Sequence, residues 1–305
     1  MRGRGLAASN KGNPMFRLSR FAALIAALAL LFTVTVEVPG VSATPRWYGG
    51  GTTTPAGVPV VFVHGFYRDS CPSAGLDVES AMAGPVYDLD ATGWSGDLDV
   101  VAYYACDQGG TRIGSDTVNT PIQTIAAQLA NYIYRTYASR GVTVDIVGHS
   151  MGGLIARAAV EYTESHVGGF PAYLLVKRVV AFSTPFAGVT TATVNAVPGL
   201  AGTYQASQVL TGSTFLQSLQ AGGAADASGG TEWLTVGSSG GCDIVSGTSA
   251  VAVPDALKLV YTGCWTHTQY LQNYVTAKSY PAYLNGAATM IYGSLELMRV
   301  FFTMA

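Results

Sequence analysis

The chain has 305 residues, of which only 11% are charged, and its formal net charge is −2. This balance provides neither a basic surface for nucleic acid nor an acidic tail, so no nucleic-acid partner is expected. Once a leader is set aside, the length suits one large domain with a substantial core, which we place at residues 44–305.

Residues 1–43 have the pattern of a signal peptide. Basic residues precede an apolar run at 21–36, and residues 41–43 offer small side chains for cleavage. A membrane anchor is the alternative, but the apolar run of about 16 residues is shorter than the ~20 residues that a membrane span needs. We therefore expect the mature protein to be secreted to the extracellular side.

The first predicted strand is a continuous apolar run at 58–63, as in strands that are buried on both faces of a parallel sheet. It leads into His64, Gly65 and Phe66, in a loop expected at the carboxyl edge of the sheet, where open α/β folds bind ligands. The backbone N–H of Phe66 is a candidate donor to an oxyanion. His64 is a candidate base, but we favour a structural role in orienting this loop.

Strands and helices alternate along the next part of the chain. A second strand is expected at 98–104, and a helix with an apolar core face between Pro121 and Gly141. This alternation predicts an α/β fold, with a mostly parallel central sheet and helices on both faces. Further strands are predicted at three apolar runs, 142–147, 177–182 and 233–236.

The stretch at 148–152 reads Gly-His-Ser-Met-Gly, between a β-branched strand pattern and a helical pattern. This strand–turn–helix setting is typical of a G-x-S-x-G nucleophile elbow, which exposes Ser150; a chance match in a glycine-rich loop is the alternative. We expect Gly148 and Gly152 because larger side chains there would collide with the serine. Met151 begins the helix, so its N–H is a second candidate oxyanion donor.

Two segments allow more than one interpretation. Residues 186–231 form a long connection rich in Gly, Ala, Ser and Thr. Connections of this length are usually functional or contain helices of their own, so a lid or pocket wall is one interpretation and surface helices are the other. The aromatic-rich segment at 290–302 is expected to be a helix packed on the core, with membrane contact as the alternative.

A serine nucleophile needs a histidine base, and the chain has four histidines. His64 and His149 belong to the loop after the first strand and to the elbow, where chain direction turns His149 away from the serine. His166 is expected at the opposite end of the sheet. His267 remains, and it suits the chain order of serine, acid and histidine.

The acid that orients this base is expected between Ser150 and His267, in a loop that follows a strand. Asp243 meets this condition because it follows the strand at 233–236 across a glycine-rich turn. Asp255, in the same long connection, is the alternative.

The four cysteines are Cys71, Cys106, Cys242 and Cys264, and an even number in an exported chain is typical of two disulfide bonds. Three pairings are open, and buried free thiols are the alternative. We favour the pairing of sequence neighbours, Cys71 with Cys106 and Cys242 with Cys264. The second bond would tie the loop of Asp243 to the loop of the candidate base.

With these residues in place, the chain resembles the α/β-hydrolase superfamily, and within it the secreted bacterial triacylglycerol lipase and esterase group. The resemblance rests on residues 60–66, 144–157, 179–188 and 209–219 and on the two loops that carry the acid and the base. It implies an α/β-hydrolase fold, a catalytic triad and an oxyanion hole. By that resemblance the triad is Ser150, Asp243 and His267, and the oxyanion hole is formed by Phe66 and Met151.

The sequence therefore predicts a secreted serine carboxylic-ester hydrolase, with a lipid or other ester as substrate and contact with a lipid–water interface. No obligate protein partner and no organic cofactor are expected. No metal is expected either, because all four histidines have other assignments and relatives with zinc use additional histidine and aspartate ligands. An extracellular acyltransferase and a non-catalytic binding protein on the same scaffold are the alternatives.

Overall fold

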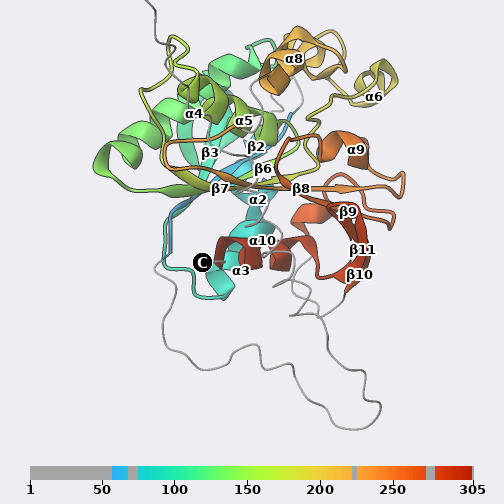
Figure 1. Ribbon diagram of the computed structural model, residues 1–305. Helices are drawn as coiled ribbons and strands as arrows, with labels where there is room; N and C mark the ends of the chain where they lie inside the picture. Colours follow the sequence, from blue (N-terminus) through green and yellow to red (C-terminus); the bar gives the residue numbers. More distant parts are fainter. Residues whose placement is uncertain (1–56, 68–74, 222–224, 273–278, 304–305) are drawn as a thin grey trace, which may run out of the picture. The chain divides into compact units, whose positions relative to one another are not determined.

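A sheet of nine strands organises the described part of the chain, in the order β11-β10-β9-β8-β7-β6-β1-β3-β5. The computed structural model describes residues 57–67, 75–221, 225–272 and 279–303 (Figure 1). These residues belong to one compact unit, Thr53–Ala305. The predicted signal peptide at 1–43 lies outside the described residues.

Seven neighbouring strands of this sheet are parallel, as the alternating pattern predicts. Strand β10 (Tyr280–Leu284) is antiparallel to β9 and to β11 (Ala287–Ile291) and ends the parallel order. In spatial order the parallel strands are β9 (Leu257–Tyr261), β8 (Glu232–Ser238), β7 (Val176–Phe182), β6 (Val144–His149), β1 (Val60–Val63), β3 (Leu98–Tyr104) and β5 (Thr111–Asp116).

Helices cover both faces of the sheet, and Figure 1 shows α4 and α5 on the face opposite to α3 and α10. These helices are α3 (Ala83–Ala91), α4 (Ile122–Thr136), α5 (Met151–Glu164) and α10 (Ser294–Thr303). Coverage on both faces explains why all four residues of β1 are fully buried. The predicted fold class, an α/β-hydrolase fold with a mostly parallel sheet, is confirmed.

The strand order reverses next to β1. From β1 the chain moves outward to β3, and it then returns to β6 on the other side of β1. Ligands of open α/β sheets bind at such a switch point, outside the carboxyl ends of the strands. The loop after β1 begins with His64, and the turn after β6 carries Ser150, so the two predicted site loops leave the sheet side by side.

The described residues of 186–231 form three short helices, α6 (Thr191–Ala196), α7 (Tyr204–Val209) and α8 (Thr214–Ala221). Their apolar side chains join the main core, and this burial accounts for the scattered apolar residues of the segment. A lid role for 186–231 stays a prediction.

The C-terminal helix α10 buries apolar and aromatic side chains, as expected for a helix packed on the core, while residues 290 and 291 belong to β11. The strands β9, β10 and β11 are additions to the predicted fold. No helix of the described residues is both long enough and apolar enough to cross a membrane.

The remaining elements are short. They are β2 (Leu76–Asp77), which pairs with β4 (Asp107–Gln108), the helices α2 (Val78–Ala81) and α9 (Gly247–Ala250), and the 3-10 turns η1 (Ala138–Arg140) and η2 (Gln269–Leu271).

Candidate active site

Ser150 lies on the turn between β6 and α5, with φ 55° and ψ −126°. A residue other than glycine rarely adopts a positive φ, and such conformations are strained. The backbone N–H of Ser150 donates to the carbonyl of Phe182 at 2.9 Å, which ties the turn to the end of β7. The predicted strand–turn–helix geometry is therefore present, with the serine at its apex.

The nearest neighbours of the elbow glycines are backbone atoms of other segments. A Cβ on Gly152 would lie 2.1 Å from the carbonyl oxygen of Val63, and a Cβ on Gly148 would lie 2.6 Å from Cα of Gly153. The nearest collisions are therefore with the backbone of the β1 end and of α5. Close packing of the elbow on its neighbours is what demands glycine at both positions.

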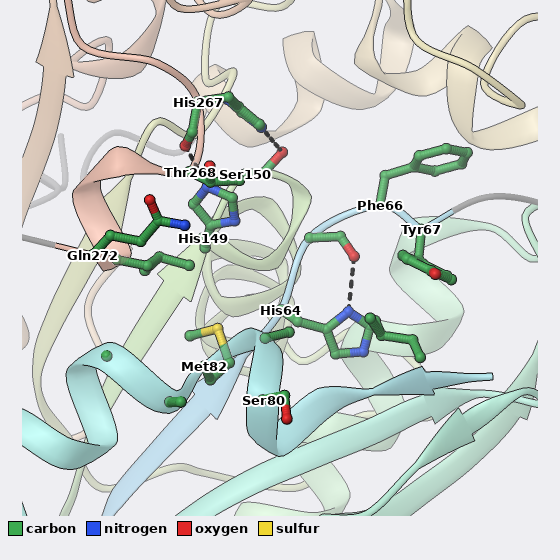
Figure 2. Close-up of a pocket in the computed structure, with 16 residues that line it drawn as sticks. His64, Phe66, Tyr67, Ser80, Met82, His149, Ser150, His267, Thr268 and Gln272 are labelled. Atoms are coloured by element: carbon green, nitrogen blue, oxygen red, sulfur yellow. Dashed lines mark hydrogen bonds between the residues drawn. The ribbon is translucent and has the colours of Figure 1, made fainter. Parts of the chain in front are cut away.

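Three side chains that are far apart in sequence meet at this turn. Nε2 of His267 lies 2.9 Å from Oγ of Ser150, and Nδ1 of His267 lies 2.9 Å from Oδ1 of Asp243. Figure 2 shows the imidazole of His267 directed at Ser150 across the hydrogen bond. Asp243 lies in the loop after β8 and His267 in the loop after β9, so the carboxyl edge of the sheet brings all three together.

Asp243 is held as a carboxylate. Its side chain is only 1% exposed, and burial alone would raise its pKa. Hydrogen bonds from His267, from the Ser183 hydroxyl and from the N–H of Val245 outweigh burial, so the net effect is a lowered pKa. An acceptor that stays ionised near neutral pH suits a carboxylate that orients an imidazole.

Ser183 is a site residue that sequence reasoning missed. It follows β7, is fully buried and has φ 46°. Its hydroxyl donates to Oδ2 of Asp243 at 2.6 Å, and its Oγ lies 2.9 Å from Nδ1 of His267. The only sequence signal was its place in the 179–188 stretch that resembles lipases.

His149 is closer to the site than chain direction suggested. Its Nε2 lies 2.8 Å from the carbonyl oxygen of His267, so the ring donates a hydrogen bond to the loop that carries the candidate base. Burial, helped by the nearby His267, lowers the pKa of His149 to about 3. His149 is thus a neutral support of that loop, and this hydrogen bond is to the carbonyl of His267 and not to Ser150.

His64 has the structural role that we favoured. Its Nε2 bonds Oδ2 of Asp107 at 3.0 Å, and its Nδ1 bonds the carbonyl of Gly65 at 2.8 Å (Figure 2). Its ring stacks on Tyr103 at 4.1 Å, and the Tyr103 hydroxyl donates to the carbonyls of both His64 and Gly65. These contacts fix the position of the loop after β1. The loop passes close to Ser150, since a Cβ on Gly65 would lie 2.7 Å from Cβ of Ser150.

The remaining predicted residues have different outcomes. Phe66 follows Gly65 and Met151 begins α5, so both flank Ser150, and the oxyanion hole they would form stays a prediction. His166 and Asp255, the residues set aside in favour of His267 and Asp243, are exposed on the surface.

One of the two predicted disulfide bonds is present. Cys242 and Cys264 are bonded, with their Cα atoms 5.1 Å apart. Cys242 directly precedes Asp243, and Cys264 lies three positions before His267, so the bond joins the acid loop to the base loop as expected. Cys71 lies outside the described residues, and its bond with Cys106 stays a prediction.

A cavity of about 400 Å³ opens beside Ser150. Its walls come from residues 64–67, from 80–84 at α2 and α3, and from 271–272 at the end of η2. Met82 and Gln272, both labelled in Figure 2, are among the lining residues, so the lining mixes apolar and neutral polar groups. The volume lies in the range of small-molecule sites. No described residue of 186–231 belongs to these walls.

Among the described residues, no group of three or more His, Cys, Asp or Glu side chains is arranged to hold a metal ion.

Several solved structures are similar to the chain at low sequence identity. The lipase BlEst2 of Bacillus licheniformis, in its mature form, is 18% identical with a TM-score of 0.44, over 71% of this chain and 87% of that one. Lipase B of Aspergillus fumigatus is 17% identical with a TM-score of 0.46, over 71% of this chain and 50% of that one. The metagenomic carboxyl esterase MGS0156 is 15% identical with a TM-score of 0.40, over 67% and 56%. No curated protein matches the sequence.

A protein family described as "Putative serine esterase (DUF676)" matches residues 60–221. The match covers more than half of the 305 residues and includes β1, the elbow with Ser150 and the end of β7 with Ser183. It ends before Asp243 and His267, whose assignment rests on geometry. The chain therefore belongs to the DUF676 serine esterase family, and it is a serine ester hydrolase.

Proposed function

We propose that the protein hydrolyses carboxylic esters of lipids through a triad of Ser150, His267 and Asp243 and an acyl-enzyme. The observation that carries this proposal is the unbroken run of hydrogen bonds from Oγ of Ser150 through both ring nitrogens of His267 to Asp243. Nucleophile, base and orienting acid are each within hydrogen-bond distance of the next, as acyl transfer by serine requires.

Acylation begins at Ser150. Its Oγ forms a bond to the ester carbonyl carbon while Nε2 of His267 takes the hydroxyl proton. The Nδ1–H of His267 donates to Oδ1 of Asp243, and the carboxylate stabilises the imidazolium that forms. The carbonyl oxygen becomes an oxyanion, for which the N–H groups of Phe66 and Met151 are the proposed donors. Met151 is well suited because it begins α5, at the positive end of the helix dipole.

Collapse of this intermediate breaks the ester C–O bond, and Nε2 of His267 returns the proton to the leaving alcohol. The acyl group is then bound to Oγ of Ser150. Water attacks the acyl carbon, with its proton taken by His267, and a second collapse releases the fatty acid and restores the serine hydroxyl. No step in this cycle calls for an organic cofactor.

The cavity supports a lipid ester as substrate. Leu76, Met82 and Leu271 provide apolar surface for an acyl chain, while His149 and Gln272 add neutral polar groups. No Asp, Glu, Lys or Arg is found among the described residues that line it, which favours an uncharged ester near the serine.

We also propose that the protein acts outside the cell. Two features support this: the signal-peptide pattern at 1–43 and the Cys242–Cys264 disulfide, a bond typical of oxidising compartments.

Hydrolysis of p-nitrophenyl esters from acetyl to palmitoyl tests the proposal, with the Ser150→Ala variant beside the wild type. We expect the wild type to cleave these esters and the variant to lose at least about 10³-fold in kcat. Ser165→Ala, an exposed serine beyond the end of α5, is the matched control and should keep wild-type turnover. Equal turnover by wild type and Ser150→Ala would refute the assignment, and the chain-length optimum separates esterase from lipase.

A further inference from the structure

Ser183 touches both partners of the Asp243–His267 pair. Its hydroxyl donates to Oδ2 of Asp243 at 2.6 Å, while His267 occupies Oδ1 of the same carboxylate at 2.9 Å. Oγ of Ser183 also lies 2.9 Å from Nδ1 of His267. Because the hydroxyl proton is given to Asp243, the oxygen lone pairs face the Nδ1–H. That N–H is thus shared between a carboxylate oxygen and a serine oxygen.

The backbone at Ser183 shows that this side chain is held in place at a conformational cost. Its φ is 46°, a region that glycine adopts freely and that L residues with a side chain rarely occupy. Its N–H donates to the carbonyl of Val236 at 2.8 Å, which ties the turn after β7 to β8, the strand that leads to Asp243. Glycine would satisfy this backbone more easily, so the fold alone does not call for a serine.

Because Asp243 is buried, its carboxylate is stabilised by the hydrogen bond from the Ser183 hydroxyl. The carboxylate is 1% exposed, and a buried carboxylate oxygen without a donor is unfavourable because it has lost its hydrogen bonds to water. The Val245 N–H and His267 both bond Oδ1, and Ser183 supplies a hydrogen bond to Oδ2. With both oxygens held, the carboxylate plane is fixed relative to the imidazole.

We propose that Ser183 is a positioning residue of the triad, whose hydroxyl fixes the Asp243 carboxylate and accepts from the Nδ1–H of His267. The inference rests on the proposed function. Ser183 is fully buried and does not line the cavity beside Ser150, so it acts through the acid and the base and does not touch the substrate. It therefore affects the chemical step and leaves substrate binding unchanged.

Two variants separate this role from a purely structural one. Ser183→Ala removes the hydroxyl and keeps a Cβ at positive φ, whereas Ser183→Gly removes the hydroxyl and relieves the backbone. We expect both to lower kcat for p-nitrophenyl butyrate by about 10- to 100-fold, the range for a lost hydrogen bond to a charged group, with KM within about twofold of wild type. The glycine variant should unfold at a higher temperature than the alanine variant and yet recover no turnover.

Ser249→Ala is the matched control. Ser249 is also a buried serine, and its hydroxyl donates to the carbonyl of Gly188 at 2.7 Å, away from Asp243 and His267. Its loss should lower the unfolding temperature and leave kcat within about twofold of wild type. If Ser183→Ala does not fold, the kcat of Ser183→Gly alone tests whether Ser183 is a positioning residue.

The inference is overturned by wild-type kcat in Ser183→Gly, by activity that recovers with stability in the glycine variant, or by a rise in KM at constant kcat. Ser150→Ala, measured in the same series, separates this failure from failure of the proposed function. If Ser150→Ala is inactive while Ser183→Gly turns over normally, only the role of Ser183 is refuted. If Ser150→Ala is active, the triad itself is refuted.

Discussion

The Cys242–Cys264 disulfide is expected to stabilise the fold and to hold the triad together. The perturbation is the double variant Cys242→Ser, Cys264→Ser, which removes the bond without leaving a lone thiol. The two cysteines are separated by 22 positions. For a loop of that length, the chain-entropy relation gives about 11 cal/mol/K, or about 3 kcal/mol at 25 °C. In a domain of this size, such a loss lowers the unfolding temperature by roughly 6–12 °C.

The effect on catalysis should accompany the loss of stability. Asp243 follows Cys242 directly, and His267 lies in the loop that the bond anchors. Without the bond, the acid loop and the base loop lose their covalent link, and small misplacements of such groups cost up to about 10²-fold in rate. We expect kcat for p-nitrophenyl butyrate to fall by about 10- to 100-fold at a temperature where the variant is fully folded.

Differential scanning calorimetry and ester turnover under non-reducing conditions measure the two effects. A second double variant, Cys242→Ala with Cys264→Ala, controls for the polarity of serine and should behave in the same way. An unfolding temperature within 2 °C of wild type, together with unchanged kcat, would show that the bond neither restrains the unfolded chain nor orients the triad; the reasoning would then be wrong.

Two further predictions concern the loops around Ser150. Gly65→Ala places a Cβ 2.7 Å from Cβ of Ser150. We expect kcat to fall at least about 10²-fold, with the helical circular dichroism retained. Turnover near wild type would show that the loop after β1 can shift without loss of activity. Burial lowers the pKa of His149 to about 3, from 6.5 for an unperturbed histidine. As the pH drops below about 6.5, the unfolded chain is therefore protonated before the folded one, and the free energy of unfolding falls. The loss in the free energy of unfolding is about 2 kcal/mol at pH 5. Urea titrations should find a smaller loss in His149→Gln, whose amide can still donate to the carbonyl of His267. Equal pH dependence of stability in both proteins would contradict the prediction.

The elbow could be predicted from sequence because its signals are local. A β-branched run, a G-x-S-x-G turn and a helical pattern follow one another directly, and the structure places Ser150 between β6 and α5 accordingly. The nearest neighbour of one of its glycines is not local. Gly152 packs against the carbonyl of Val63, from a strand about 90 positions earlier, and no pattern within the elbow reveals that neighbour.

The site residues also differ in whether a sequence pattern could reveal them. His267 and Asp243 were found by elimination and by their place after strands, because the carboxyl ends of parallel strands meet at one edge. Ser183 could not be found in this manner. Its contact with Asp243 spans 60 positions and depends on β7 and β8 being neighbours, and nothing in the Ser-Thr-Pro sequence marks the hydroxyl as a partner of the triad.

Two features of the C-terminal strands explain why the sequence did not predict them. Strand β9 alternates buried and half-buried residues over only five positions. Strand β10 contains Pro281, a residue that argues against a strand within a sheet because it lacks an N–H. Pro281 lies just outside the pairing of β10 with β9, which begins at Ala282, so its missing N–H falls at the end of that ladder.

The most direct test of the account is covalent trapping of the nucleophile. The wild type, Ser150→Ala and His267→Ala are treated with a fluorophosphonate, and the adduct is located by intact and peptide mass spectrometry. We predict a single adduct on Ser150 in the wild type, none in Ser150→Ala, and a labelling rate at least about 10²-fold lower in His267→Ala. An adduct on any other residue, or undiminished labelling of Ser150→Ala, would contradict the proposed triad.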